Sequence, residues 1–556
     1  MPDLPRWFPF LRWPRPDAAL LRGEILAGLT VALVMVPQSV AYAGLAGMPL
    51  VTGLYAALLP PVAAVLFGSS TRLSVGPAAL TCVLVGASLT GLAAPASAEW
   101  VALAVWLALL SGVIQLALGA GGLAWLLNVV SAPVLTGFTQ AAALLIMASQ
   151  LPALTGLQGP LSSLWAAPAF DTTAMAFGIA SLGVLVLGRR WLPRWPTVVV
   201  VMAMAALASR MSGYSAQGAV IGSLPSGLPA FYLPPLPSWE VLSTLVVPAL
   251  VIALVSFLET AASAKIESQR DGKRWDDNRD LMAQGLAKLA SAFSGSFATS
   301  TSFSRSAIAL FAGARTGWSA IAAAAFVLLA LLFLTPLLYH VPRAVLAAVV
   351  IAAVAGLLKP RAFGVLWRVD RVEAATALVT FGVTLLSAPR IYWGVLAGVL
   401  MGLAHFLYHR LHPRIIEVGL HPDGSLRDRH LWRLPPLAPH LYAMRMDADL
   451  DFASASAFER SLTEQLAVQP GLRHVCLFAH PINRVDATGV DVFVQLLARL
   501  DALGITVHIS GIKLPVERVL RQSGALPEGP LLRLYRTDAD ALQALGMPGD
   551  GRTEEP

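Results

Sequence analysis

The sequence predicts a polytopic α-helical membrane domain followed by a small soluble α/β domain. Its 556 residues are 56% hydrophobic and only 13% charged, and the mean hydropathy is +0.68, which ordinary soluble proteins do not reach. Apolar runs long enough to cross roughly 30 Å of hydrocarbon recur between about residues 23 and 409. Beyond residue 409 the composition becomes that of a soluble protein. We therefore expect a membrane domain at 23–409.

Charge and cysteine usage exclude two other classes of protein. The cysteines, Cys82 and Cys476, fall in a membrane segment and in the soluble region, so a disulfide framework is excluded. The net charge of +7 is typical of a topology signal, because Lys and Arg accumulate in cytoplasmic loops, and we expect no nucleic acid partner. Residues 1–22 lack the pattern of a cleaved signal peptide. We expect them to form a cytoplasmic segment held by Arg6, Arg12, Arg15 and Arg22.

Fourteen membrane spans can be assigned, in two groups of seven. The first group lies near residues 23–44, 49–67, 76–93, 100–119, 122–150, 172–188 and 196–211. The second lies near 241–264, 281–294, 304–317, 319–338, 342–358, 372–388 and 391–409. An even number returns the C-terminus to the cytoplasm. The sequence thus predicts a multi-pass protein of a bacterial-type inner membrane with both termini in the cytoplasm.

The distribution of positive charge supports this orientation. The loops assigned to the inside contain Arg72, Arg189, Arg190, Arg194, Lys265, Arg270, Lys273, Arg274, Arg279, Arg315, Lys359, Arg361, Arg368 and Arg371. The loops and span ends assigned to the outside contain Arg210, Arg343 and Arg390. This asymmetry follows the positive-inside rule.

Two groups of seven spans begin on opposite sides of the membrane, which indicates an inverted repeat. The third member of each group is short and is entered through Gly, Pro or hydroxyl residues; in span three these are Gly76 and Pro77, followed by Ala78. Proline favours the first helical position, and Ser or Thr caps free N–H groups, so both helices are expected to start inside the membrane. Their N-termini, each with roughly half a positive charge, would face an anion between them.

A permanent cation, Arg305, lies in the first turn of span ten, within the stretch 298–313 that is rich in hydroxyl side chains and then becomes apolar. It opposes the helix dipole by about 0.3 to 1 kcal/mol and is costly to bury. A bound oxyanion between the guanidinium and the N–H groups would explain the position, with Ser304 and Ser306 beside it. The alternative is a structural ion pair with Glu259.

Glu259 follows a long, largely apolar run and should lie well inside span eight. An intramembrane carboxylate is by default functional. Burial favours the protonated form of this carboxyl, whereas a neighbouring arginine favours the ionised form. It could therefore take up and release protons as the pocket fills and empties. The alternative is a helix-end glutamate that snorkels to the cytoplasmic face, since Lys265 and Glu267 follow closely.

Span one carries a proline with polar neighbours. Pro37 interrupts the helical hydrogen-bond ladder, and Gln38 and Tyr42, four residues apart, share one face of the helix. These two side chains could line the pocket as uncharged donors. The alternative is a packing kink in which Gln38 bonds to the freed backbone.

Four motifs together resemble the sulfate permease (SulP) family of anion transporters, which includes prestin. They are VPQSVAYAGLAGMPLVTGLY in spans one and two, FGSSTRLSVGPAAL entering span three, TSFSRS entering span ten, and VPRAVLAAVV in span twelve. The resemblance covers nearly the whole chain. It implies seven-plus-seven spans divided into core and gate domains, with the anion between spans three and ten, and a homodimer.

The resemblance also implies roles for single residues. Carried over by motif, Gln38 and Tyr42 line the site from span one, Ala78 lines it from span three, and Ser304 and Arg305 line it from span ten. Ala78 departs from members with an aromatic residue there, which weakens any inference about anion size. Glu259 falls where coupled members have an acidic residue, and glutamate is similar to the proton-coupled pattern.

The C-terminal region reads as a linker at 410–435, an α/β domain at 436–548 and a disordered tail at 549–556. Strands are expected in LYAMRMDADLDF, HVCLFAH and TVHISGI, and helices near 453–467, 488–503 and 515–523. The domain is similar to STAS domains, which end SulP transporters and resemble anti-sigma-factor antagonists. Thr488 matches the hydroxyl that those antagonists have phosphorylated. Alternatively, Thr488 merely caps the following helix.

The sequence therefore predicts a secondary transporter of an oxyanion, sulfate first, coupled to protons and working by alternating access. No cofactor, metal site or catalytic activity is expected, because no metal-ligand or triad spacing is found. Bicarbonate or a C4-dicarboxylate is an alternative substrate. An uncoupled exchanger or channel, and a membrane-anchored anion sensor that signals to a cytosolic partner through its STAS domain, are alternative functions.

Overall fold

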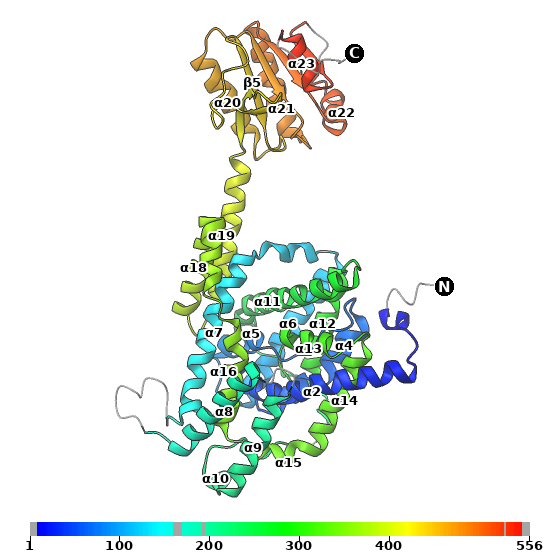
Figure 1. The fold of residues 1–556 in the computed structure, drawn as a ribbon, viewed down its shortest axis with the longest axis vertical. Coiled ribbons are helices and arrows are strands. Elements are labelled where there is room, and N and C mark those ends of the chain that lie inside the picture. Colours follow the sequence, from blue (N-terminus) through cyan, green and yellow to red (C-terminus); the bar gives the residue numbers. More distant parts are fainter. Residues whose placement is uncertain (1–7, 159–168, 192–194, 226, 527–529, 547–556) are drawn as a thin grey trace. The chain divides into compact units, whose positions relative to one another are not determined.

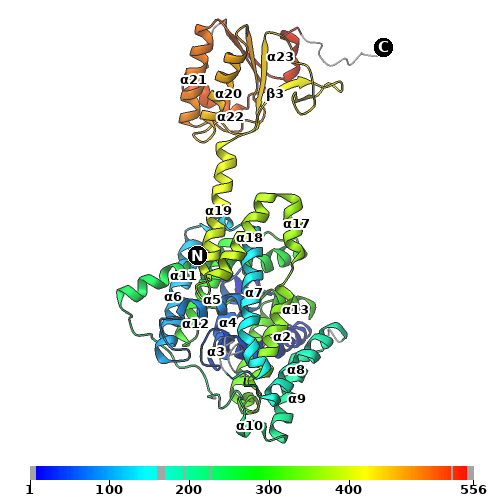
Figure 2. The same ribbon diagram turned by 90° about the vertical axis from the view of Figure 1, so that its left-hand side faces the viewer.

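The computed structural model describes residues 8–158, 169–191, 195–225, 227–526 and 530–546 (Figures 1 and 2). The chain divides into two compact units, Met1–Gly402 and Leu403–Pro556. Arg6, Arg194 and the expected tail at 549–556 lie outside the described residues. The first unit is almost wholly helical, and the second is built around a six-stranded sheet.

The helices of the first unit follow the expected spans in order. The first half contains η1 (Pro9–Arg12), α2 (Ala18–Leu45), α3 (Thr52–Ala56), α4 (Leu59–Phe67), α5 (Ala79–Leu89), α6 (Ala98–Ala120), η2 (Ala124–Val129), α7 (Ala132–Thr155), α8 (Thr172–Trp191), α9 (Thr197–Met211) and α10 (Tyr214–Gln217). The second half contains α11 (Trp239–Asp271), α12 (Asp277–Phe293), α13 (Phe303–Phe311), α14 (Trp318–Leu329), η4 (Ala330–Leu334), α15 (Thr335–Leu338), α16 (Arg343–Val354), η5 (Ala355–Leu357), α17 (Arg361–Val369), α18 (Arg371–Leu386) and α19 (Tyr392–Leu411).

Every expected span contains a helix or consecutive helices. Within the described ranges, eight helical segments are long and apolar enough to cross a membrane. They are Ala18–Leu45, Ala98–Ala120, Ala132–Thr155, Thr172–Trp191, Trp239–Asp271, Trp318–Leu338, Arg343–Val369 and Tyr392–Leu411. The count of fourteen spans stays a prediction.

The helices of the first unit pack in two groups. In one, α12 lies against α6 and α4, α11 lies against α6 and α5, and α14 lies against α2 (Figure 1). In the other, α7 packs against α16 and α18, and α16 packs against α8 (Figure 1). Glycines allow α6 and α12 to cross closely, because a Cβ added to Gly285 of α12 would lie 2.7 Å from the carbonyl oxygen of Gly112 of α6. This crossing brings buried side chains of α6, α11 and α12 together.

The two halves meet through two short strands in the middle of the first unit. Strand β1 (Val75–Gly76) precedes α5, and β2 (Ser300–Thr301) precedes α13. The strands are antiparallel, with Val75 opposite Thr301 and Gly76 opposite Ser300. Both helices that follow are short, as the sequence predicts. The antiparallel pairing therefore places the starts of α5 and α13 beside one another, as expected for an inverted repeat.

The second unit is a sheet with helices on both faces. Its strands are β3 (Ile415–Leu420), β4 (Leu426–Asp428), β5 (Leu441–Met446), β6 (His474–Phe478), β7 (Thr506–Ser510) and β8 (Leu532–Tyr535), in the order β4-β3-β5-β6-β7-β8. The pairs from β5 to β8 are parallel, and β3 is antiparallel to β4 and β5. The helices are α20 (Ala455–Val468), α21 (Ala487–Ala502), α22 (Leu514–Gln522) and α23 (Asp538–Ala544).

Alternating side chains of β5 supply the cores on the two faces of this sheet. Met444 packs with residues of α20, α21 and α22, whereas Ala443 packs with Leu542 of α23. This alternation follows from the two-residue period of a strand. The three strands and three helices that the sequence predicts are all present.

The segment 410–435 differs from the expected linker because it contains β3 and β4. Its charged residues, which suggested a solvated connection, pair across this hairpin: Arg414 with Asp428 at 2.8 Å, and Arg429 with Glu417 at 2.6 Å. Ile415 lies opposite Met446 in β5, so the pairing that orders the segment is distant in sequence. The sheet of the second unit therefore begins before residue 436.

Candidate functional site

The backbone at the starts of α5 and α13 is arranged differently in the two halves. The residue before α5 is Ala78, whose side chain makes no capping hydrogen bond, whereas Ser302 before α13 accepts from the Arg305 N–H at 3.5 Å. Pro77 precedes Ala78, so the expectation that proline occupies the first helical position is wrong. The N-terminus of α5 therefore keeps N–H donors that no side-chain cap satisfies.

Arg305 is fully buried, with an exposed fraction of 0%. Its Nε donates to Ser74 Oγ at 3.2 Å, and its Nη1 donates to Gln38 Oε1 at 3.3 Å. Its Nη2 is buried and has no hydrogen-bond partner. These contacts hold the guanidinium in place and leave one of its donor groups open.

Gly76 gives this open donor room. Its φ is +150°, a conformation that L-residues rarely adopt, and a Cβ there would lie 3.5 Å from Arg305 Nη2. A side chain at this position would therefore occupy space beside the donor. Glycine at position 76 therefore has two roles: it adopts a positive φ, and it leaves space beside the Arg305 donor.

The alternative of an ion pair between Arg305 and Glu259 is wrong. The Glu259 carboxylate accepts from Ser300 Oγ at 2.5 Å and from Thr81 Oγ1 at 3.4 Å, and no ion pair of Arg305 is found in the described part of the chain. Glu259 does not snorkel either, because it lies well before Asp271, the last residue of α11, and its carboxylate faces β2 and α5. Three elements of the first unit therefore enclose this carboxylate.

Gln38 and Tyr42 both lie on α2, which continues through Pro37 from Ala18 to Leu45. Gln38 is buried, and its side-chain oxygen accepts a hydrogen bond from Arg305. It therefore does not bond to the backbone carbonyl freed by Pro37, which was the alternative. Tyr42 is buried and interacts electrostatically with Arg305. The two side chains therefore belong to the surroundings of the guanidinium.

The three predicted residues next to Arg305 and Gly76 have different surroundings. Ala78 is buried, with an exposed fraction of 3%. Ser306 is also buried, and its hydroxyl accepts from the Ser74 N–H at 3.0 Å and donates to the Ser302 carbonyl at 2.9 Å, so it joins the entrances of spans three and ten. Ser304 is exposed, and its Oγ lies 3.3 Å from Ser302 Oγ. Ser304 is thus not brought to the open donor of Arg305.

A second buried basic residue was not predicted from the sequence. Lys288 of α12 is fully buried, and its Nζ donates to Gln115 Oε1 at 2.8 Å and to Ser256 Oγ at 2.9 Å. The signal that could have found it is a lone charge among small and apolar residues in 281–294.

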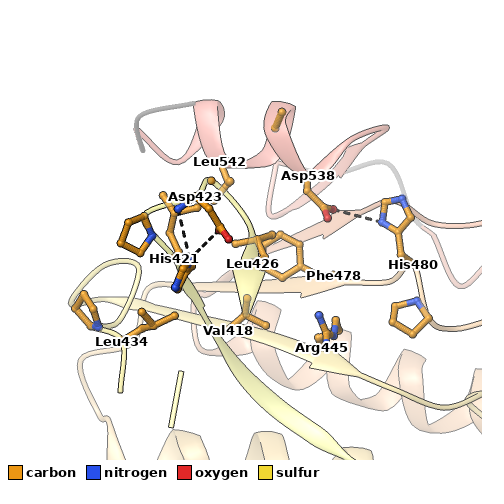
Figure 3. Close-up of a pocket in the computed structure, with 16 residues that line it drawn as sticks. Val418, His421, Asp423, Leu426, Leu434, Arg445, Phe478, His480, Asp538 and Leu542 are labelled. Carbon is orange, nitrogen blue, oxygen red and sulfur yellow. Dashed lines mark hydrogen bonds and ion pairs between the residues drawn. The ribbon is translucent and has the colours of Figure 1, made fainter. Parts of the chain in front are cut away.

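A second candidate site lies in the second unit. A cavity of about 970 Å³ is lined by the β3–β4 hairpin, the end of β6 and α23 (Figure 3). Its floor is apolar, with Val418, Leu426 and Phe478, while His480 faces Asp538 at 3.5 Å at one end. No group of three or more His, Cys, Asp or Glu side chains suited to a metal ion is found among the residues described.

Thr488 is exposed in the first turn of α21. The alternative that it caps this helix is wrong, because the cap is Asp486, whose Oδ1 accepts from the Gly489 N–H at 2.8 Å. Burial raises the pKa of Asp486, but hydrogen bonds from the backbone N–H groups of Gly489, Phe452 and Thr488 outweigh this effect, and the pKa is lowered. The Thr488 hydroxyl therefore remains accessible at a helix N-terminus.

Comparison with known proteins places these features in a family. The model of the "Sulfate permease family" matches residues 21–380, and that of the "STAS domain" matches residues 436–541. A probable sulfate transporter of Mycobacterium tuberculosis is 32% identical, over 94% of this chain and 95% of its own.

Two solved structures show the fold. The murine Solute Carrier 26 family member A9 anion transporter, in an inward-facing state, matches with a TM-score of 0.86 at 20% identity, over 97% of this chain and 94% of its own. The transmembrane domain of a cyanobacterial bicarbonate transporter, BicA, matches with a TM-score of 0.60 at 19% identity, over 70% of this chain and 99% of its own. The predicted fold class, a helical membrane transporter fold followed by a STAS domain, is confirmed.

Proposed function

The chain belongs to the sulfate permease family, and on that premise we propose that it carries a small oxyanion, sulfate first, across the membrane by secondary transport. The observation that carries the proposal is the buried Arg305, whose Nη2 has no hydrogen-bond partner. A buried donor of this kind is costly to leave unsatisfied. A bound oxyanion would satisfy it.

The surroundings of Arg305 fit such a ligand. The N–H groups at the start of α5, which has no side-chain cap, and the guanidinium can donate to the same anion, because β1 and β2 join the two helix starts. Gln38 and Ser74 hold the guanidinium through their oxygens, so they fix its direction without neutralising it. Gly76 leaves room beside Nη2, and Ala78 and Tyr42, whose side chains carry no negative charge, are the other residues proposed to line the site.

Glu259 is the proposed proton-coupling group. Its carboxylate accepts hydrogen bonds from Ser300 of β2 and Thr81 of α5, the two elements that also form the anion site. A change in its protonation would therefore alter contacts that join the two halves. Binding and release of the proton and the anion are linked in this proposal, and the two packed helix groups move against one another by alternating access. A homodimer and a cytosolic partner of the STAS domain, with Thr488 as its regulatory hydroxyl, belong to the same proposal.

The test is transport by the purified protein in liposomes. Labelled sulfate uptake is measured with and without an inward proton gradient, and it is competed with bicarbonate, succinate and fumarate. Uptake that depends on the gradient and is competed by unlabelled sulfate supports the proposal. Uptake of a competitor without sulfate uptake would make the substrate assignment wrong, and gradient-independent exchange would make the coupling assignment wrong.

The cavity of the STAS domain favours a second candidate function, an anion sensor that signals through this domain. The cavity is large enough for a small molecule, and it combines an apolar floor with charged side chains. Counterflow in liposomes separates the two functions, because a transporter exchanges labelled for unlabelled anion and a sensor does not.

A further inference from the structure

Lys288 is a fully buried cation that the proposed transport cycle does not use. Its stem lies in the crossing of α6 and α12, where a Cβ on Gly112 would be 3.1 Å from Lys288 Cβ. The absence of a side chain at Gly112 therefore makes room for the lysine. Its Nζ ends between α6 and α11, with Gln115 Oε1 at 2.8 Å and Ser256 Oγ at 2.9 Å.

The partners of Lys288 are oriented as acceptors. The Gln115 amide nitrogen donates to the Ala253 carbonyl at 2.8 Å and to Ser256 Oγ at 2.9 Å, which leaves the Gln115 oxygen facing Nζ. The Ser256 hydroxyl itself donates to the Ala253 carbonyl at 3.2 Å. Two acceptors facing one nitrogen suit an ammonium group, which has donors and no acceptor.

Ser256 and Ser300 lie between this nitrogen and Glu259, and the Ser300 hydroxyl has an acceptor on each of Ser256 and Glu259 for its one proton. Ser256, which binds Nζ through its hydroxyl, accepts through its carbonyl from Ser300 Oγ at 3.2 Å. The same Ser300 hydroxyl lies 2.5 Å from Glu259 Oε2. Ser256 and Glu259 are also three residues apart on α11, so they are neighbours on one face of the helix.

Two basic side chains lie near the Glu259 carboxylate. They are Lys288 from α12 and Arg305 from α13. Tyr42 of α2 and Cys82 of α5 are the other titratable groups near this cluster, and both are buried. Gln115, the contact from α6, carries no charge. An anion bound at Arg305 would offset the charge of that guanidinium, and Lys288 would remain as the second basic group beside the carboxylate.

We propose that Lys288 is a positioning residue of the coupling step, a tethered positive charge that sets the pH at which Glu259 takes up its proton. This inference rests on the proposed role of Glu259 in proton coupling. A fixed cation favours the ionised carboxylate. Glu259 can then release its proton inside the protein even when an anion is bound at Arg305. Lys288 offsets the negative charge of the carboxylate, so no metal cation is needed for this purpose.

The experiment measures gradient-driven sulfate uptake into liposomes as a function of pH. The variants are Lys288→Met and Lys288→Asn, which remove the charge, and Lys288→Arg, which keeps it. We expect both neutral variants to move the pH midpoint of uptake upward by about one unit, since the carboxylate loses a cation that favours ionisation. Lys288→Arg should stay close to the wild type. The apparent KM for sulfate, which depends on Arg305, should change by less than about threefold.

Two controls separate this inference from the proposed function. Glu259→Gln should remove the pH dependence, and Lys288→Asn in the Glu259→Gln background should not restore it or shift it. If Glu259→Gln keeps the wild-type pH profile, the coupling assignment is wrong. If Glu259→Gln is flat and the neutral Lys288 variants keep the wild-type midpoint, Lys288 does not set the pH and the inference is overturned.

The inference can still be tested if one of the Lys288 variants fails to fold. Met and Asn differ in length and polarity, so a folding defect of one of them leaves the other as the neutral variant. A midpoint shift shared by Asn and Met and absent from Arg follows from charge. A shift that Arg also shows follows from packing and would overturn the inference.

Discussion

Replacement of Arg305 by alanine is the most direct test of the anion site. The substitution removes the open Nη2 donor group and the charge, and it also removes the hydrogen bonds to Ser74 and Gln38. A hydrogen bond to a charged group contributes about 1.5 to 3 kcal/mol. An oxyanion that takes one N–H group of Nη2 would lose about 1.5 to 3 kcal/mol of binding free energy, and its Kd would rise by about 10-fold to 150-fold.

The free energy of unfolding should change less, because two effects oppose one another. The alanine leaves Ser74 Oγ and Gln38 Oε1 without their partner, at about 1 to 3 kcal/mol each. It also removes a buried charge that has no ion-pair partner in the described residues, and this removal is favourable. We therefore expect a change in thermal stability of a few degrees at most, and a small one compared with the loss of affinity.

The assay is equilibrium binding of labelled sulfate to purified protein, with thermal unfolding measured on the same samples. Arg315→Ala is the matched control, because Arg315 follows α13 in a loop and its side chain is exposed. Its Kd should stay within about twofold of the wild type. Arg305→Lys keeps the charge without the planar fork and should fall between wild type and alanine. An unchanged Kd in Arg305→Ala, or an equal loss in the Arg315 control, would refute the argument.

Three further outcomes are expected. Glu259→Gln should retain sulfate exchange and lose pH-driven accumulation, and retained accumulation in liposomes would remove Glu259 from the coupling step. Gly76→Ala should reduce both sulfate affinity and thermal stability, because its φ of +150° is strained for alanine by about 1 to 3 kcal/mol and the new Cβ lies 3.5 Å from Arg305 Nη2. Burial, His474 and Arg533 lower the pKa of His508 to about 4. Below about pH 6.5 the unfolded state therefore binds more protons than the folded state, and the free energy of unfolding of the STAS domain should fall by up to about 3 kcal/mol between pH 6.5 and 4. The measurement is hydrogen exchange of β7, which should become faster over this range after correction for intrinsic rates. The effect should be absent in His508→Gln.

Composition and local pattern were enough to predict the fold class. Long apolar runs can only be membrane segments or a buried core. Of the two short spans, α13 is capped by a predicted hydroxyl residue, Ser302, whereas Pro77 lies one residue before the N-cap of α5. The same reasoning could identify Arg305 because a charge in an apolar region has few explanations. It could not choose between an anion and Glu259 as the partner, because that choice depends on where Ser300 and Thr81 direct the carboxylate.

The strands at 415–428 were missed for a different reason. Their charges suggested solvent, and they are instead paired within the hairpin, as Arg414 with Asp428 shows. The partner of β3 is β5, which lies beyond the hairpin in sequence. The local sequence does not indicate which distant segment a strand pairs with. A short amphipathic strand with charged neighbours is therefore interpreted as a linker.

Lys288 shows how packing can hide a functional candidate from sequence reasoning. A lysine in a membrane span is easily taken for one that reaches the interface, because its stem is apolar and flexible. Here Gly112 and Gly285 bring α6 and α12 so close that the stem is enclosed, and Gln115 and Ser256 hold the ammonium at its end. Lys288 is bonded to Ser256 of α11, whereas the Nη2 of Arg305 has no hydrogen-bond partner. An anion at Arg305 would offset the charge of the guanidinium and leave the contacts of Lys288 unchanged, and the proposed role of Lys288 rests on this difference.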